Sequence, residues 1–541
     1  DDFKKLGQQT MAGLGFVSNF LFWQQAGYFD GASDTKPLLH LWSLAIEEQF
    51  YIFFPLILLF FYRRKLNLAK ALWWLFVVSV LINLYYARHN LTADFYSPLS
   101  RAWELLAGSL IAVYARRPGS IAAHDGNQKI KNWVSVGAII FLIVALYFID
   151  KSRKFPGSWA LLPVLVGGGF ILAGPHTWIN KKILASKPFV WMGLISYPLY
   201  LWHWPLLVLG HHYYGTAFDW KIKLVAIVLA VVLSALCYYF LEKPIRIAKK
   251  SSTIILKVLI VLAVVIGYLG YSVYNKQGYP KRYPAIIQQL TTSQGNLQDG
   301  WRVYKCMLEY EQPASQFAEY CIEKNQRPHV FLWGDSHAGS LYPGLLALQK
   351  STHNSFALSQ RTGAMCPALL NTEMRPLCKD LNNSTIQVIR QTQPDVVVLY
   401  GLWSHLSYDL SQLAPTIQEL KKAGVQKIIM LGVPVMWEGK LPDHILAQWR
   451  EGPPLAEPAL RSWRGVGKDL TELDEKISKI ASQAGVEYIS MRQLFCNEQG
   501  CLTRPSLNSS APMSYDYGHL TVPAASYAAD LLAPKILTLP K

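Results

Sequence analysis

The sequence predicts a polytopic α-helical membrane domain followed by a three-layer α/β domain outside the cytoplasm. Three observations support this fold class. Apolar runs of near-spanning length fill the first half of the 541 residues, strand-like and helical stretches alternate from residue 328 onward, and six of the seven cysteines follow residue 300. A chain of this length exceeds one ordinary domain, and we expect segments at 1–274, 275–327 and 328–541.

The membrane domain is predicted from about nine apolar runs, because a bilayer-spanning helix needs about 20 apolar residues. These runs lie at 11–24, 43–62, 70–87, 98–115, 134–149, 157–174, 188–209, 222–241 and 254–274. The chain begins at Asp1 rather than Met, a few residues before the first run, so we expect this domain to be N-terminally incomplete.

The charges of the loops predict the orientation of the helices. The loops at 63–70, 116–131, 175–187 and 242–250 carry 15 Lys and Arg residues, whereas those at 25–42, 87–97, 150–156 and 210–220 carry 5. The positive-inside bias puts the first set in the cytoplasm, and residues after about 275 then lie outside it. We attribute the net charge of +17 mainly to these loops and expect no nucleic-acid partner.

Cysteine usage points to the same side of the membrane. Cys237 lies in a membrane run, and an even number of cysteines in an exported domain indicates disulfides. Among fifteen possible pairings we favour the three local ones: Cys306 with Cys321, Cys366 with Cys378, and Cys496 with Cys501. The alternative is six reduced, buried thiols in a cytosolic domain.

The second half predicts a parallel sheet covered by helices on both faces. The segment 275–327 is polar and is expected to be a linker and adapter. Strand-like runs follow at 329–333, 395–400, 426–431 and 486–489, with helical stretches at 337–350, 411–423 and 467–484. Reactive groups in such sheets lie at the carboxyl ends of the strands.

Ser336 stands at such a position, after a strand and the tight turn Gly334-Asp335. A serine hydroxyl needs a base to take its proton, and an imidazole needs a carboxylate to hold the right tautomer. Asp516-Tyr-Gly-His519 near the C-terminus can supply both. We expect Ser336 as nucleophile, His519 as general base and Asp516 as its orienting partner. The alternatives are a helix N-cap for Ser336 and a solvated loop histidine for His519.

Acyl transfer also needs donors for the oxyanion. The backbone N–H of Ser336 at a helix N-terminus is one candidate, and that of Gly363 is a second, with a plain turn as the alternative for Gly363. We expect no catalytic role for the neighbouring His337.

These motifs resemble the SGNH hydrolase/acyltransferase superfamily, which implies a flavodoxin-like α/β fold. Gly334-Asp335-Ser336 is similar to its first block, Gly363 to its second and Asp516-Tyr-Gly-His519 to its last. The third block normally supplies an asparagine after a glycine. This chain has Tyr400-Gly-Leu-Trp-Ser404 there, without the asparagine, so the side-chain oxyanion donor is unassigned.

Three clusters of polar residues interrupt the membrane half, where ionisable groups are expensive and point to function. The first has His40, Glu47 and Glu48, in the segment Leu-His-Leu-Trp-Ser-Leu-Ala-Ile-Glu-Glu-Gln-Phe-Tyr. The second has Arg101 and Glu104, which share a helix face, and the third has His203 in Tyr-Pro-Leu-Tyr-Leu-Trp-His-Trp-Pro. The alternative is interfacial aromatics and structural ion pairs.

In combination, these segments are similar to the membrane-bound acyltransferase-3 family over residues 10–274. Fusions of this family to an SGNH domain resemble bacterial O-acetyltransferases of surface polysaccharide, notably lipopolysaccharide O-antigen. The resemblance implies acetyl-CoA as donor, a lipid-linked or nascent polysaccharide as acceptor, and contact with membrane lipid. We expect no metal, because transfer from a thioester to an ester needs none and the sequence has no metal-ligand spacing. The resemblance also implies a multi-pass protein of the bacterial inner membrane with its SGNH domain in the periplasm.

The resemblance further implies two or three more N-terminal helices that carry an arginine and a histidine. The sequence leaves the sugar, its hydroxyl and the glycan open. Two other functions use the same features: a membrane-anchored carbohydrate esterase, and a transporter with a vestigial SGNH domain.

Overall fold

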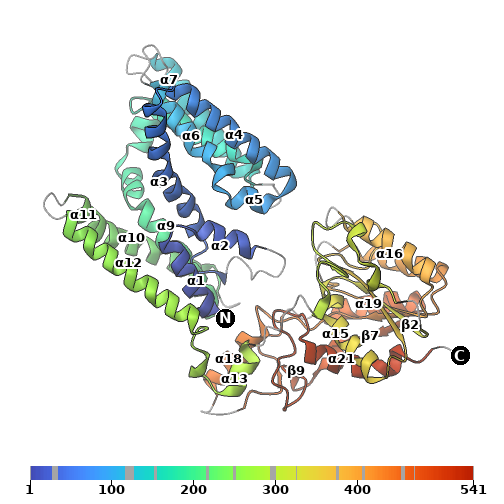
Figure 1. Ribbon diagram of the computed structural model, residues 1–541. Helices are drawn as coiled ribbons and strands as arrows, with labels where there is room; N and C mark the ends of the chain where they lie inside the picture. Colours follow the sequence, from blue (N-terminus) through green and yellow to red (C-terminus); the bar gives the residue numbers. More distant parts are fainter. Residues whose placement is uncertain are drawn as a thin grey trace. The chain divides into compact units, whose positions relative to one another are not determined.

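The computed structural model divides into two compact units, Asp1–Tyr279 and Pro280–Lys541, each described here by itself (Figure 1). The described residues are 2–26, 35–115, 127–150, 155–214, 218–247, 252–292, 300–323, 326–372, 377–404, 408–452, 457–467 and 470–539.

The first unit is built of helices. In chain order they are α1 (Asp2–Leu14), α2 (Ser18–Gln25), α3 (Leu41–Arg63), α4 (Leu68–His89), α5 (Leu91–Tyr96), α6 (Pro98–Ala115), α7 (Gln128–Phe148), α8 (Leu161–Ala173), α9 (Lys187–Tyr214), α10 (Trp220–Cys237), α11 (Lys243–Ile247) and α12 (Ser252–Asn275). Short 3-10 or π segments stand at Gly157–Ala160, Asn180–Leu184 and Tyr238–Glu242. The pairs that pack most extensively are α9 with α10, α4 with α6, α7 with α8, and α1 with α12.

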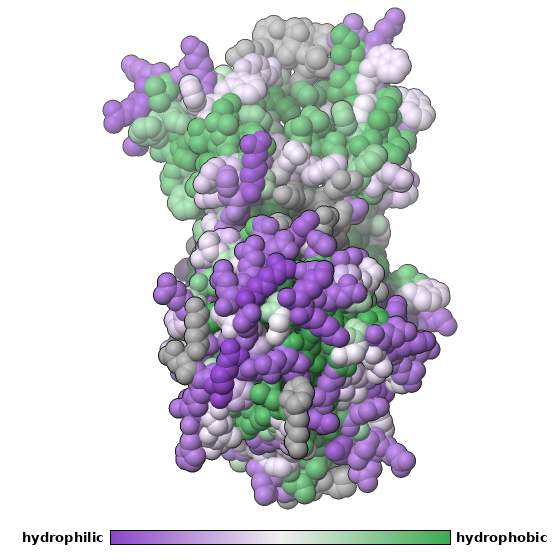
Figure 2. Space-filling view, turned by 90° about the vertical axis from the view of Figure 1, so that its right-hand side faces the viewer, coloured by the Kyte–Doolittle hydropathy of each residue, from purple (hydrophilic) through white to green (hydrophobic). Residues whose placement is uncertain are grey.

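Five described stretches are long and apolar enough to cross a membrane: Leu41–Arg63, Leu68–His89, Gln128–Phe148, Trp220–Ile247 and Thr253–Asn275. Many of their large apolar side chains are exposed, and Figure 2 shows hydrophobic residues gathered over this unit. Such a surface suits a bilayer, because apolar side chains facing lipid incur no hydration cost. The predicted helical membrane domain is therefore confirmed as a fold class.

The first predicted run, 11–24, is not one helix. The chain leaves α1 at Leu14, and Phe16 adopts a φ of 54°, after which α2 begins at Ser18. Two glycines, Gly13 and Gly15, stand at this break, and glycine is a poor helix former.

The second unit contains a six-stranded parallel sheet with the order β1-β3-β2-β4-β5-β7. Its strands are β1 (Met307–Leu308), β2 (His329–Gly334), β3 (Ala357–Gly363), β4 (Val396–Tyr400), β5 (Lys427–Leu431) and β7 (Glu487–Ile489). The main helices are α15 (Ser336–Ser351), α16 (Cys378–Thr392), α17 (Leu413–Lys422), α18 (Leu441–Glu451), α19 (Thr471–Gln483) and α21 (Val522–Ile536). Smaller elements are α13 (Ala285–Thr292), α20 (Met491–Phe495), and a three-stranded sheet of β6 (Arg461–Ser462), β9 (Gly500–Leu502) and β8 (Cys496–Asn497).

Two apolar clusters make this unit a three-layer α/β domain, as predicted. On one face of the sheet, α15, α18 and α21 bury Leu341, Ile445 and Leu532. On the other face, α16, α17 and α19 bury Ile389, Ile417 and Ile477. The chain order reverses at β2, which lies between β3 and β4. A crevice for ligands forms at the carboxyl ends of strands at such a switch point, and Ser336 follows β2 directly.

Candidate active site

The turn between β2 and α15 brings Ser336 to the carboxyl edge of the sheet. Gly334 ends β2 so close to β4 that a Cβ there would lie 1.8 Å from the carbonyl oxygen of Tyr400. Only glycine allows this approach. The chain then turns within one residue into α15, whose first residue is Ser336.

Asp335 fixes this turn from inside the protein. It is the N-cap of α15 and accepts a hydrogen bond from the backbone N–H of His337 at 2.8 Å, so the cap is not Ser336. Its other carboxylate oxygen accepts from the backbone N–H of Leu402 at 2.7 Å and from the Tyr408 hydroxyl at 3.1 Å. Burial raises the pKa of the Asp335 carboxyl, and these donors oppose the shift. Leu402 lies in the loop where the third SGNH block would carry its asparagine.

Ser336, His519 and Asp516 form a continuous hydrogen-bonded chain. The Ser336 Oγ lies 2.8 Å from His519 Nε2, and His519 Nδ1 lies 2.7 Å from Asp516 Oδ2. The other carboxylate oxygen of Asp516 accepts from the backbone N–H groups of Gly518 and His519, at 2.9 and 2.8 Å. Because the carboxylate accepts a hydrogen bond from Nδ1–H, Nε2 carries no proton and is left as the acceptor that a general base needs.

Aromatic rings surround the His519 imidazole. The centroid distances are 4.2 Å to His337, 5.1 Å to Tyr517, 5.2 Å to Trp301 and 6.1 Å to Tyr515. We call these four residues the aromatic collar. Ser336 and His519 are each only 2% exposed, so the collar keeps bulk water from the serine–histidine pair.

The two predicted oxyanion donors come from adjacent strand ends. Ser336 begins α15, so its backbone N–H belongs to the first turn of that helix, where N–H groups have no acceptor within the helix itself. Gly363 ends β3, and its neighbour Thr362 is in register with Gly334 at the end of β2. The structure therefore brings both residues to the same part of the sheet edge.

The structure pairs all six cysteines of this unit. The disulfides are Cys306–Cys321, Cys366–Cys378 and Cys496–Cys501. The first closes a loop that contains β1, the second links the segment after β3 to the start of α16, and the third closes the β8–β9 hairpin. Cys237, in the helical unit, is free.

In the helical unit, two of the predicted histidines approach each other. The ring of His40, just before α3, lies 6.0 Å from that of His203 on α9. Between these helices the Tyr200 hydroxyl hydrogen-bonds to the Ser43 Oγ at 2.7 Å and to the His40 carbonyl oxygen. Both ring nitrogens of His40 are buried.

The other predicted residues of the helical unit lie on α3 and α6. Arg101 and Glu104 form an ion pair at 2.6 Å on α6, and the Arg101 guanidinium lies 5.4 Å from the Trp42 ring centroid. Glu47 and Glu48 lie half-buried on α3, within the two turns that follow His40. Among the described residues there is no cluster of three or more His, Cys, Asp or Glu side chains that could hold a metal ion.

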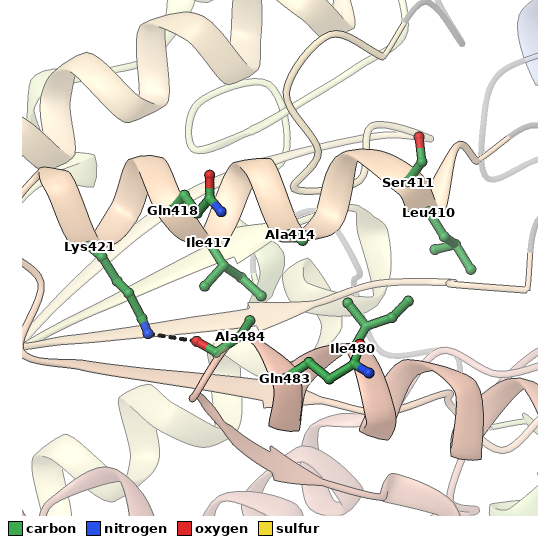
Figure 3. Close-up of a pocket in the computed structure, with 9 residues that line it drawn as sticks. All are labelled: Leu410, Ser411, Ala414, Ile417, Gln418, Lys421, Ile480, Gln483 and Ala484. Atoms are coloured by element: carbon green, nitrogen blue, oxygen red, sulfur yellow. Dashed lines mark hydrogen bonds between the residues drawn. The ribbon is translucent and has the colours of Figure 1, made fainter.

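A surface hollow of about 410 Å³ lies between α17 and α19 (Figure 3). None of its lining residues belongs to the triad of Ser336, His519 and Asp516. Lys421 crosses it to donate a hydrogen bond to the Ala484 carbonyl oxygen at 2.6 Å. The other lining groups are aliphatic, hydroxyl and amide side chains without a nucleophile–base pair. The triad therefore remains the candidate reactive centre.

Sequence reasoning did not assign Asp335, Tyr408 and the collar a place in the site. Tyr515 and Tyr517 flank Asp516 in the sequence, which is a usable signal. Trp301 lies more than two hundred residues before His519, in the segment expected to be a linker, and carries no local signal.

Two protein families match this chain, each over a different half. Residues 305–534 match the family described as "SGNH domain (fused to AT3 domains)", and residues 10–242 match the family described as "Acyltransferase domain".

Two relatives match about half of the chain. "Putative peptidoglycan O-acetyltransferase YrhL" of Bacillus subtilis is 30% identical over 251 residues, which are 44% of this chain and 39% of that protein. "O-acetyltransferase OatA" of Staphylococcus aureus is 27% identical over 282 residues, 48% of this chain and 46% of that protein. The chain thus spans less than half the length of these relatives.

Among solved structures, the periplasmic domain of a lipopolysaccharide acetyltransferase of Salmonella ser. Paratyphi A is 26% identical. It covers 46% of this chain and 99% of its own, with a TM-score of 0.39. The two family matches together with the observed folds identify the chain as an acyltransferase-3 (AT3) domain fused to an SGNH domain.

Proposed function

We propose that this chain is an O-acetyltransferase that moves an acetyl group from cytoplasmic acetyl-CoA across the inner membrane to a sugar hydroxyl of a surface polysaccharide. The observation that carries the proposal is the hydrogen-bonded chain from Ser336 through His519 to Asp516, at 2.8 and 2.7 Å. The match of residues 10–242 to an acyltransferase family also supports the proposal, because it gives the membrane domain an acyl-transfer activity.

The chemistry is two acyl transfers through one serine. The Ser336 Oγ attacks the acetyl carbonyl carbon while His519 Nε2 takes the hydroxyl proton, and Asp516 stabilises the imidazolium. The backbone N–H groups of Ser336 and Gly363 donate to the oxyanion. His519 then gives this proton to the leaving group of the acetyl donor, and Ser336 carries the acetyl ester. In the second transfer a sugar hydroxyl gives its proton to His519 and attacks the ester carbonyl carbon. The bond to the Ser336 Oγ breaks, and His519 returns a proton to that oxygen.

We also propose the location and the roles of the membrane residues. Apolar helices, the excess of Lys and Arg in alternate loops and three disulfides in the α/β unit support a multi-pass inner-membrane protein with a periplasmic SGNH domain. His40 and His203, with Arg101 and Glu104, are our candidates for the membrane step, because ionisable groups are costly in membrane-spanning helices; His40 is buried and the other three are half-buried.

The acceptor that we propose is lipopolysaccharide O-antigen, which follows the family resemblance of the motifs. Peptidoglycan is the alternative, because it stands in the name of a relative that is 30% identical. Both are glycans with free hydroxyls, so the triad chemistry serves either.

The test measures acetyl esters on separately purified lipopolysaccharide and peptidoglycan from cells that make the full protein. Ser336→Ala should abolish the acetyl esters, whereas Ser351→Ala, an exposed serine at the other end of α15, should leave them unchanged. The fraction that loses its esters identifies the acceptor. Unchanged acetylation in Ser336→Ala refutes the proposal, and increased acetylation indicates an esterase.

A further inference from the structure

The residue after the nucleophile lies against the proposed catalytic base. The His337 ring stacks on the His519 ring with centroids 4.2 Å apart and an angle of 17° between the planes. His337 is the second residue of α15, so the helix that begins at Ser336 carries both the nucleophile and this ring. Its side chain is 1% exposed.

The His337 side chain makes ring contacts rather than hydrogen bonds. Tyr400, at the end of β4, and Tyr517, beside Asp516, lie edge-on at 6.2 and 6.0 Å. Both ring nitrogens are buried, and no described residue hydrogen-bonds to either. Burial, and secondarily the charge of His519, lower the pKa of His337 well below its usual range. What the ring offers its neighbour is therefore a neutral, flat face.

We propose that His337 is a positioning residue, whose stacked ring holds the plane of His519 so that Nε2 stays directed at the Ser336 Oγ as the imidazolium forms. This inference rests on the proposed function. The proton passes from Ser336 to His519 and back, and His337 neither gains nor loses one. A neutral π face also attracts a cation, whereas a protonated ring at this distance would repel it.

The geometry favours stacking over proton relay. A relay needs a hydrogen-bond partner at each ring nitrogen, and both nitrogens of His337 are buried without such a partner among the described residues. Its nearest neighbours besides His519 include Tyr400, Tyr517 and Gly518. Hydrogen bonds hold both nitrogens of His519, at 2.7 Å to Asp516 and 2.8 Å to Ser336, but the second is lost when the Ser336 Oγ bonds to the acyl group, and the tilt of the imidazole plane is then less restricted. A second, parallel ring restricts that tilt.

The experiment uses the full chain in detergent and two readouts that need no glycan acceptor. One is the rate at which a fluorophosphonate probe labels Ser336, and the other is kcat and KM for hydrolysis of p-nitrophenyl acetate. The variants are His337→Ala, which removes the ring, and His337→Phe, which keeps a flat ring without nitrogens. His353→Asn, at an exposed turn with a φ of 52°, is the matched control, because asparagine tolerates that backbone conformation.

We expect His337→Ala to lower the labelling rate and kcat about 100-fold with little change in KM, because small misplacements of a reacting group cost about that much. His337→Phe should recover most of this loss, and His353→Asn should match the wild type. Thermal melting shows whether each variant folds, and His337→Phe keeps the test decisive if His337→Ala does not.

Two results would overturn the inference. One is a folded His337→Phe protein as slow as His337→Ala, which would mean that the nitrogens matter. The other is a His337→Ala protein as fast as the wild type. A wild-type protein that resists the probe would instead refute Ser336 as the nucleophile, and with it the proposed function.

Discussion

The substitution Asp516→Asn separates the orienting role of this carboxylate from its structural role. One oxygen of Asp516 accepts from His519 Nδ1 at 2.7 Å, and the other accepts from two backbone N–H groups. Asparagine can keep the backbone bonds through its carbonyl oxygen. Its amide then donates toward Nδ1, so the remaining proton of His519 moves to Nε2 and faces the Ser336 hydroxyl. In that tautomer the imidazole cannot take the serine proton.

The expected loss of rate is large and the expected loss of stability is small. The matching substitution in serine proteases lowers kcat about 10⁴-fold, which is roughly 5.5 kcal/mol of activation free energy. Folding should change by less than about 1 kcal/mol, because the Asp516 side chain is 23% exposed and both backbone bonds remain. Asp516→Ala would add the cost of two unpaired donors, about 1–3 kcal/mol each if they stay dry.

The assay is the second-order rate of Ser336 labelling by a fluorophosphonate at pH 7, with Asp530→Asn, an exposed carboxylate on α21, as the control. We expect Asp516→Asn to label about 10⁴-fold more slowly at an unchanged melting temperature, and Asp530→Asn to label normally. A decrease below about tenfold in folded protein would show that Asp516 does not set the tautomer, and would refute the triad as described.

Two further predictions concern stability. Gly334→Ala should lower the free energy of unfolding by more than about 4 kcal/mol, or prevent folding, because its Cβ would lie 1.8 Å from the Tyr400 carbonyl oxygen. The control is Gly452→Ala, whose Cβ would meet no atom nearer than 3.4 Å. Equal melting temperatures for the two variants would contradict the close approach of β2 to β4. Burial lowers the pKa of His329 from 6.5 to about 4 in the folded protein. As the pH falls below 6.5, the unfolded chain therefore binds a proton at His329 that the folded protein does not yet bind. Up to roughly 3 kcal/mol of stability present above pH 6.5 should be lost as the pH falls to 4. Denaturant unfolding of the α/β unit across this range should be less pH-dependent in His329→Gln, and an unchanged slope would exclude His329 as the source.

Most of the sheet was predictable because its central strands are continuous apolar runs. The strand β3 is the exception, since its residues Ser359, Gln360, Arg361 and Thr362 are polar yet buried. Segments far away in the sequence supply several of their hydrogen bonds: Gln360 donates to the Trp301 carbonyl oxygen at 3.0 Å, and Arg361 donates to the Ser384 hydroxyl at 3.0 Å. Hydrophobic periodicity cannot find a strand whose buried polar groups bond to such distant segments.

The residues of the site also fall into those that the sequence predicts and those that only tertiary packing brings there. Ser336 and the Asp516–His519 pair stand in local motifs, so the sequence alone suggests the reaction. The stacking of His337 on His519 depends on how α15 approaches the loop before α21, and the position of Trp301 depends on a segment that looks like a linker. These contacts arise from tertiary packing and leave no pattern in the sequence.

The short strand β1 has a practical consequence. It pairs with β3, and the Cys306–Cys321 disulfide closes the loop that carries it. A truncated protein that began at residue 328 would present the backbone N–H and C=O groups of β3 as an open edge, which invites aggregation. It would also lack the Trp301 wall of the site. A soluble fragment intended for crystallisation or inhibitor screening should therefore retain residues 300–323, and the disulfide makes an oxidising host the suitable place to produce it.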